Sequence, residues 1–141
     1  MLGKGALKMT KSNVGDVLAK ATAFGVAGWV AENALSDHDR YSALFKGHRV
    51  PFLPVYAVGG VVLTSAASYL GKWPTLARGL AYAILGTGVE YIGCIIDRRF
   101  LQARSWDYGQ RDALARASEG CLNFAHAALW GGLGIIAEKF K

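Results

Sequence analysis

Charged residues are scarce in this sequence of 141 residues. Asp, Glu, Lys and Arg make up 18% of it, against about 25% in soluble globular domains, and hydrophobic residues make up 52%. Proline is also rare, with three residues against eighteen glycines. Most of these glycines lie within long apolar runs, which is more typical of membrane helices than of soluble ones. The composition therefore argues against an ordinary soluble domain.

Cysteine is nearly absent, and metal-ligand spacings are absent. Cys94 and Cys121 are the two cysteines of the chain, and a single pair does not make a disulfide framework. Both lie in apolar stretches, so two buried small hydrophobic side chains are the favoured interpretation, with a disulfide between helices as the alternative. Because no Ser–His or Cys–His arrangement is evident either, we predict no catalytic residue, no metal and no cofactor.

The net charge of +6 would suit nucleic-acid binding if the basic residues formed one patch. They lie instead in the gaps between the apolar runs, where they would meet lipid headgroups. We therefore predict membrane lipids as partners, and no nucleic acid.

Four apolar segments predict four transmembrane helices. About 20 residues cross a hydrocarbon core of about 30 Å at 1.5 Å per residue. The predicted spans cover residues 17–35, 50–70, 76–97 and 118–138, after a short basic N-terminal lead-in at Met1–Lys11. The predicted fold class is therefore all-α, an integral membrane bundle of four transmembrane helices that forms a single membrane domain over residues 1–141.

The connections between the predicted spans indicate on which side of the membrane each loop lies. Gly71–Pro74 reads Gly-Lys-Trp-Pro, a helix stop followed by a restart, since Gly suits a helix C-terminus and Pro the first turn of the next helix. This predicts a tight antiparallel hairpin of the second and third spans. The two longer loops, Ser36–Arg49 and Asp97–Glu119, then lie on one side of the membrane. Each side carries eight Lys and Arg residues, so the positive-inside rule leaves the orientation open.

Acidic residues share helical faces with glycines. The third span carries the clearest such face, with members three or four residues apart: Tyr82, Gly86, Glu90, Gly93 and Asp97. Glu32 lies on a similar face of the first span, and Asn123 in a small-residue stripe of the fourth, as in closely packed membrane helices. These three acids and the amide are predicted to converge in the half of the bundle nearest the long loops.

An ionisable group inside a span costs at least about 2.5 kcal/mol on insertion scales, which makes it a functional candidate. The structural alternative is that Glu90 or Glu32 pairs with an arginine such as Arg49 and locks the bundle. A carboxylate–arginine cluster can serve both purposes. His126, in the fourth span, is expected to be a core histidine bonded to a backbone carbonyl and not a proton relay.

Several local strings, taken in order, resemble a known family. They are Gly28-Trp29-x-x-Glu32, Pro51-x-x-Pro54-Val55-Tyr56-x-x-Gly59, Glu90-Tyr91, Trp106-Asp107-Tyr108, and Gly120-Cys121-Leu122 with Trp130-Gly131. From about Phe24 to Lys141 they are similar to the "Putative ABC-transporter type IV" family of small bacterial membrane proteins. The resemblance implies a multi-span protein of the bacterial inner membrane. It also implies a separate ATPase partner, because the sequence has no GxxxxGK[ST] phosphate loop.

Together these patterns define a candidate binding site. Its residues are Glu32, Arg49, Tyr56, Glu90, Asp97, Trp106, Asp107, Tyr108 and Asn123. Asp107 is expected to join the intramembrane acids beneath Arg49 and Tyr56, or else to anchor the loop at the membrane surface by pairing with an arginine.

The leading hypothesis for function is a transport or ligand-binding component whose acidic intramembrane pocket takes a cation, a proton or a polar head group. Two alternatives stay open. One is an accessory or structural subunit of a larger membrane complex. The other is a lipid-modifying membrane enzyme that uses paired carboxylates as acid and base. A homodimer or a larger membrane complex is expected in either setting.

Overall fold

The computed structural model describes residues 11–35, 53–102, 104 and 106–140, without the side chains at 11–13, 29, 31–35 and 53. This part of the chain is all-helical and has no strand, which confirms the all-α class. Its long helices are α1 (Lys11–Leu35), α2 (Leu53–Leu70), α3 (Thr75–Ile95) and α5 (Phe124–Ala137). Its short elements are the π-helix η2 (Ile96–Phe100), the helix α4 (Ala113–Ala117) and the 3-10 turn η3 (Glu138–Phe140).

The predicted hairpin of α2 and α3 is confirmed. The backbone N–H of Trp73 donates to the carbonyl of Leu70 at 2.9 Å and closes the end of α2. Pro74 is the N-cap of α3, and its carbonyl accepts from the N–H of Arg78 at 3.0 Å. The proline has no N–H to leave unsatisfied, so the chain restarts as helix within four residues.

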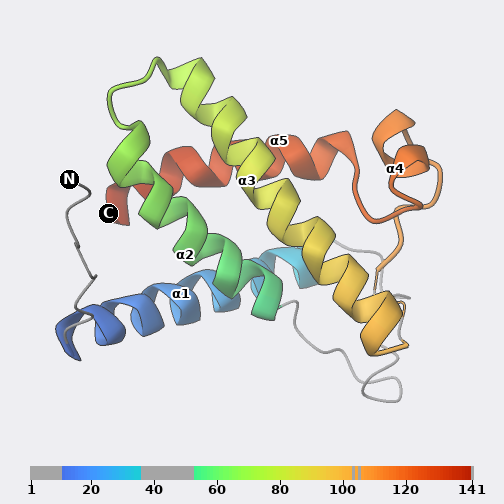
Figure 1. Ribbon diagram of the computed structural model, residues 1–141, viewed down its shortest axis with the longest axis horizontal. Coiled ribbons are helices and arrows are strands. Elements are labelled where there is room, and N and C mark those ends of the chain that lie inside the picture. Colours follow the sequence, from blue (N-terminus) through green and yellow to red (C-terminus); the bar gives the residue numbers. More distant parts are fainter. Residues whose placement is uncertain (1–10, 36–52, 103, 105, 141) are drawn as a thin grey trace, which may run out of the picture.

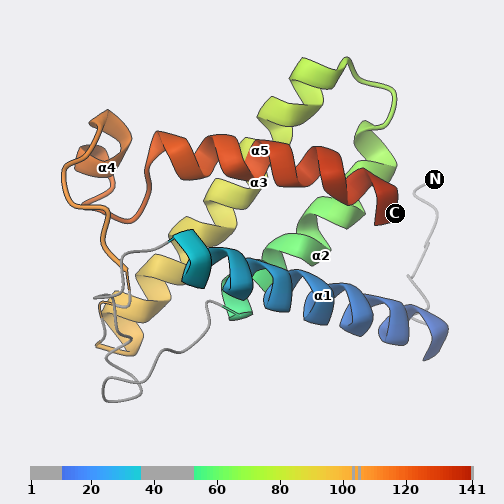
Figure 2. The same ribbon diagram turned by 180° about the vertical axis from the view of Figure 1, so that it is seen from behind.

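The four long helices form two layers. The α2–α3 hairpin lies in front in Figure 1, and α1 and α5 lie behind it and cross it obliquely. The view from behind, in Figure 2, brings α1 and α5 to the front. The main packing partners are α3 with α5 and α1 with α2. The molecule is therefore built from two helix pairs joined through the hairpin.

Glycines bring the helices of these pairs close together. A Cβ at Gly28 of α1 would overlap the Tyr56 side chain of α2, and one at Gly134 of α5 would overlap Tyr82 of α3. Close backbone approach through small residues is the packing mode of membrane helices. The predicted glycine faces are thus where α1 meets α2 and where α3 meets α5.

Helix α3 hides polar groups and exposes apolar ones. Its buried residues are Tyr82, Gly86, Glu90 and Cys94. Large aliphatic side chains that are 46% to 77% exposed run along α3 and into η2: Leu76, Leu80, Ile84, Ile92 and Ile96. A water-soluble helix shows the reverse arrangement, so this outer stripe marks a surface that an apolar environment or a partner covers.

Within the described residues, one helix is long and apolar enough to cross a membrane. It runs over Thr75–Phe100, with 26 residues and a mean hydropathy of 1.5, while Pro54–Leu70 is a shorter apolar helix. The prediction of four such spans is therefore met in part. Helix α5 starts at Phe124, not at residue 118, because Asn123 caps it. Its 14 residues reach about 21 Å at 1.5 Å per residue.

Candidate functional site

Glu90 is the best-defined acidic group of the described structure. It lies in the middle of the candidate span and is 5% exposed. The Tyr108 hydroxyl donates a hydrogen bond to its Oε1 at 2.6 Å, and the Trp130 indole N–H donates to its Oε2 at 3.0 Å. Two donors on two oxygens complement the ionised carboxylate, which otherwise pays a high desolvation cost.

Tyr108 reaches Glu90 because the chain after η2 folds back along α3. The Tyr108 N–H donates to the carbonyl of Gly120 at 2.8 Å. Gly120 has φ +82°, a left-handed conformation that glycine adopts without a Cβ penalty. The Tyr108 ring also packs against the His126 imidazole, with ring centroids 4.6 Å apart. The loop and the start of α5 thus hold the tyrosine in place.

Asn123 joins this group at the start of α5. Its Oδ1 accepts from the backbone N–H of His126 at 2.7 Å, an N-cap that fixes the orientation of the amide. The same oxygen lies 3.2 Å from His126 Nδ1. Its Nδ2 is buried and has no hydrogen-bond partner. Asn123, predicted as a binding residue, is therefore a capping residue whose two amide N–H donors are unused, and its amide oxygen also lies beside the His126 ring.

Trp130 links Glu90 to the centre of the molecule. Its indole lies against both Gly59 of α2 and Gly86 of α3, where a Cβ would overlap the ring. Tyr56 of α2 stacks on the same indole, with 5.4 Å between the ring centroids. Three helices therefore fix the indole that donates to Glu90.

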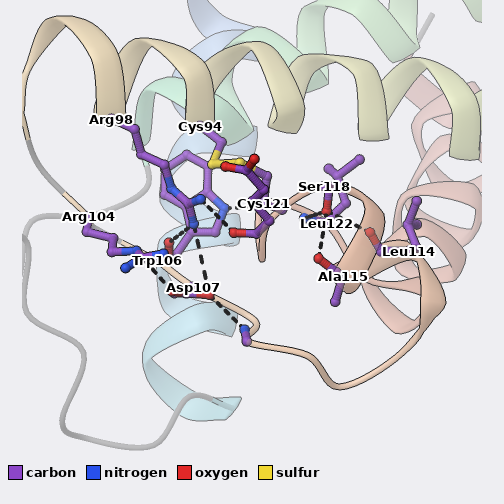
Figure 3. A network of polar contacts seen from close by, with 12 residues as sticks. Cys94, Arg98, Arg104, Trp106, Asp107, Leu114, Ala115, Ser118, Cys121 and Leu122 are labelled. Carbon is purple, nitrogen blue, oxygen red and sulfur yellow. Dashed lines mark hydrogen bonds and ion pairs between the residues drawn. A yellow bond between two sulfur atoms is a disulfide. The ribbon is translucent and has the colours of Figure 1, made fainter.

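Asp107 faces a different group of side chains, shown in Figure 3. Its carboxylate lies 3.0 Å from Arg104 Nε and 3.9 Å from Arg98 Nη2, and it accepts from the N–H of Gly109 at 2.7 Å. Asp107 is thus an arginine-paired loop anchor, which was the second of the two roles expected for it. In the segment Trp106–Tyr108, it is the tyrosine that contacts Glu90.

The cysteines form a disulfide, so the favoured interpretation of two separate buried thiols is wrong. Cys94 of α3 and Cys121 are bonded, with their Cα atoms 5.7 Å apart. The Trp106 indole N–H donates to the Cys121 carbonyl at 3.2 Å beside this bond. The sequence placed both cysteines in apolar stretches, but their approach depends on the return of the chain from η2 to α5, which is a long-range property.

Several predicted site residues come together, and others cannot be placed. Four of them lie near the disulfide, toward the C-terminal end of α3: Glu90, Trp106, Tyr108 and Asn123. Tyr56 contacts this group through its stacking on Trp130. Asp97 is buried in η2, on the same face as Glu90. Glu32 lies in α1, but its side chain and all of Arg49 are outside the described residues.

A second polar cluster was not predicted. Glu138 accepts from Arg78 Nε at 2.6 Å and from the Tyr82 hydroxyl at 2.9 Å, at the opposite end of α3 and α5. The signal in the sequence was that Arg78 and Glu138 sit at the same end of neighbouring predicted spans. Trp130 was also missed as a site residue, although a buried indole N–H regularly needs an acceptor.

The chemistry of this site centres on the Glu90 carboxylate, which accepts hydrogen bonds from the Tyr108 hydroxyl and the Trp130 indole N–H. Among the described residues, no group of three or more His, Cys, Asp or Glu side chains could hold a metal ion. Glu90 can accept a proton or pair with a small cation, and either event would alter its bonds to Tyr108 and Trp130 together.

Comparison with known proteins places the chain in a family. The model of the family described as "Putative ABC-transporter type IV" matches residues 21–141. No curated protein and no solved structure shows a significant match. The matched region contains α2, α3, α5 and the whole Glu90 site. The chain belongs to the Putative ABC-transporter type IV family.

Proposed function

We propose that this chain is an integral membrane component of a transport or ligand-binding system, in which Glu90 takes a proton or a small cation. The observation that carries this proposal is the buried Glu90 carboxylate within the apolar candidate span, bonded to Tyr108 and Trp130. An ionisable group at such a position is costly and is a functional candidate by default. The family description supports an ABC-transporter-related role.

The membrane part of the proposal is supported by the two faces of α3. The aliphatic stripe from Leu76 to Ile96 faces outward, as a surface in contact with acyl chains would. We propose that α1, α2 and α5 enter the bilayer beside it and complete a four-span membrane domain over residues 1–141. With 25 and 18 residues, α1 and α2 reach about 37 Å and 27 Å at 1.5 Å per residue.

Glu90 couples its charge to two separate parts of the molecule. Tyr108 belongs to the loop after η2, and Trp130 belongs to α5. A proton or cation that arrives at the carboxylate competes with both donors for its oxygen lone pairs. The charge state of one side chain therefore bears on the position of the loop and on the packing of α5.

The first test is a titration of the purified protein in lipid nanodiscs, read by tryptophan fluorescence. Wild type should show a sigmoidal response to pH that Glu90→Gln lacks, because the acceptor of the Trp130 indole then no longer changes charge. Glu119→Gln, which alters an exposed acid at the same end of the molecule, should titrate as wild type does. The same titration of Trp130→Phe shows whether the fluorescence change comes from Trp130, because the change should then disappear. A Glu90→Gln protein that titrates like wild type contradicts the proposal.

The second test measures flux. Liposomes that contain the protein and a trapped pH-sensitive dye should show proton or sodium-coupled proton movement that Glu90→Gln abolishes and Glu119→Gln preserves. The two alternatives give other outcomes: normal activity of a larger complex with Glu90→Gln favours an accessory subunit, and chemical change of added lipid favours an enzyme.

A further inference from the structure

The disulfide lies directly beside the Glu90 site. Cys94 follows Glu90 by four residues, about 6 Å along the helix, and both cysteines are buried. The other half of the bond, Cys121, follows Gly120, whose carbonyl holds the Tyr108 N–H. The disulfide therefore fixes to α3 the segment that positions the Tyr108 hydroxyl on Glu90.

Disulfides form and persist in oxidising compartments and are rare in the cytosol. We infer that the end of α3 that carries Cys94 faces the oxidising, non-cytoplasmic side of the membrane, and that Glu90 exchanges its proton or cation with that side. The second clause, and the membrane itself, rest on the proposed function. In forming the bond, the two thiols give up two protons and two electrons to a disulfide-bearing oxidant of that compartment.

The disulfide gives a direction where the distribution of charge gives none. Lys and Arg are equally numerous on the two sides of the predicted domain, so the positive-inside rule gives no direction. The disulfide is a marker of a different kind, because it reports the redox state of the compartment where the loop folds. By this criterion residues 106–123 lie outside the cytoplasm and the Gly71–Pro74 turn lies inside.

The position of Glu90 along α3 agrees with access from the disulfide end. Glu90 is ten residues from the end of η2 at Phe100 and fifteen from the start of α3 at Thr75, distances of about 15 Å and 22 Å. Its nearer end is also the end where a loop side chain, Tyr108, covers it. The farther end carries the cluster of Tyr82, Arg78 and Glu138, in which Tyr82 is buried and the two charged side chains are partly buried.

The inference is tested by labelling in intact cells with a membrane-impermeant maleimide. Two positions are compared with the native cysteines left in place: Gln110→Cys in the loop and Lys72→Cys in the hairpin turn, both exposed. We expect the maleimide to label Gln110→Cys in intact cells. It should label Lys72→Cys only after the cells have been permeabilised. The unsubstituted chain should stay unlabelled, and after denaturation it should gain two labels with reductant and none without.

Each other outcome has a definite meaning. The reversed pattern, or free thiols in the denatured unsubstituted chain, overturns the inference while leaving a membrane-spanning Glu90 protein intact. Labelling of both positions in the same compartment contradicts the membrane part of the proposed function. Adding Glu90→Gln to either cysteine variant should leave its labelling pattern unchanged.

Access to Glu90 from the loop side is tested with right-side-out and inside-out vesicles. A pH step on the loop side should change Trp130 fluorescence, and a step on the hairpin side should not. A response to the pH step on the hairpin side, with none on the loop side, would show that Glu90 is not reached from the loop side. If neither side gives a response while the labelling pattern is as expected, Glu90 does not titrate, and it is the proposed function that fails.

Discussion

Asp112 ties the starts of two helices together. Its Oδ1 accepts from the N–H of Ala115 at 2.8 Å as the N-cap of α4, and its Oδ2 accepts from the N–H of Phe124, the first residue of α5, at 2.9 Å. The hydrogen bond from Ala115, followed by that from Phe124, holds the pKa of this carboxyl below its ordinary value. The charge of Asp112 is therefore part of how the loop is folded.

This lowered pKa predicts a pH-dependent effect of Asp112→Asn. The unfolded chain binds the proton more tightly, so the contribution of Asp112 to stability is full above the unfolded pKa of about 3.9. It is lost as the pH falls through the lower folded pKa. An amide offers one acceptor oxygen in place of two, so the variant should melt below wild type at pH 7.

The measurement is the melting temperature from tryptophan fluorescence at pH 7 and again near pH 3. The gap between wild type and Asp112→Asn should narrow in acid, while Glu119→Gln should melt close to wild type at pH 7. A gap of the same size at both pH values would mean that the charge of Asp112 is not involved.

At the scale of the element, α3 offers a matched pair of glycines. Gly86 lies against the Trp130 indole, and Gly88 has nothing within 4 Å of where its Cβ would be. Gly86→Ala should lower the free energy of unfolding by about 1–3 kcal/mol, because an indole held by three helices cannot move away cheaply. Gly88→Ala should be neutral or stabilise by up to about 1 kcal/mol, since alanine is the better helix former.

Chemical unfolding of the two variants in the same detergent measures this difference. Gly86→Ala should also change the tryptophan emission, because the added methyl displaces Trp130 from Glu90. Equal effects of the two substitutions would show that Gly86 serves helix propensity and not packing.

Local periodicity explains which parts of these elements could be predicted. The buried face of α3 follows from residues three or four apart, and the α2–α3 hairpin from the Gly and Pro of its turn. The contact of Tyr108 with Glu90 needs the chain to return over 18 residues, which no spacing encodes. The start of α5 was misplaced because Asn123 was treated as a face residue, although it is a side chain well suited to capping.

At the scale of the whole molecule, the disulfide predicts a large loss of stability on its removal. It closes a loop with a sequence separation of 27 residues, which corresponds to about 3.5 kcal/mol of denatured-state entropy. Cys94→Ser/Cys121→Ser should lose stability of this order. It should also release Tyr108 from Glu90.

Unfolding curves with and without a reductant check this for the unsubstituted chain, and the double variant should no longer respond to the reductant. The pH response of Trp130 in the double variant reports on the released tyrosine. Wild type and double variant of equal stability would indicate that the helix packing alone holds the loop.

Helix α5 is fastened to α3 at both of its ends, covalently through Cys121 just before its start and by the Arg78–Glu138 ion pair just after its end. A rod held at two points can neither slide along its neighbour nor roll against it. Large motions of this protein should then leave α3 and α5 as one rigid body, with α1 and α2 rocking against it. The stacked rings of Tyr56 and Trp130 would slide on each other in such a movement. A shift of the Trp130 indole would then change its hydrogen bond to Glu90.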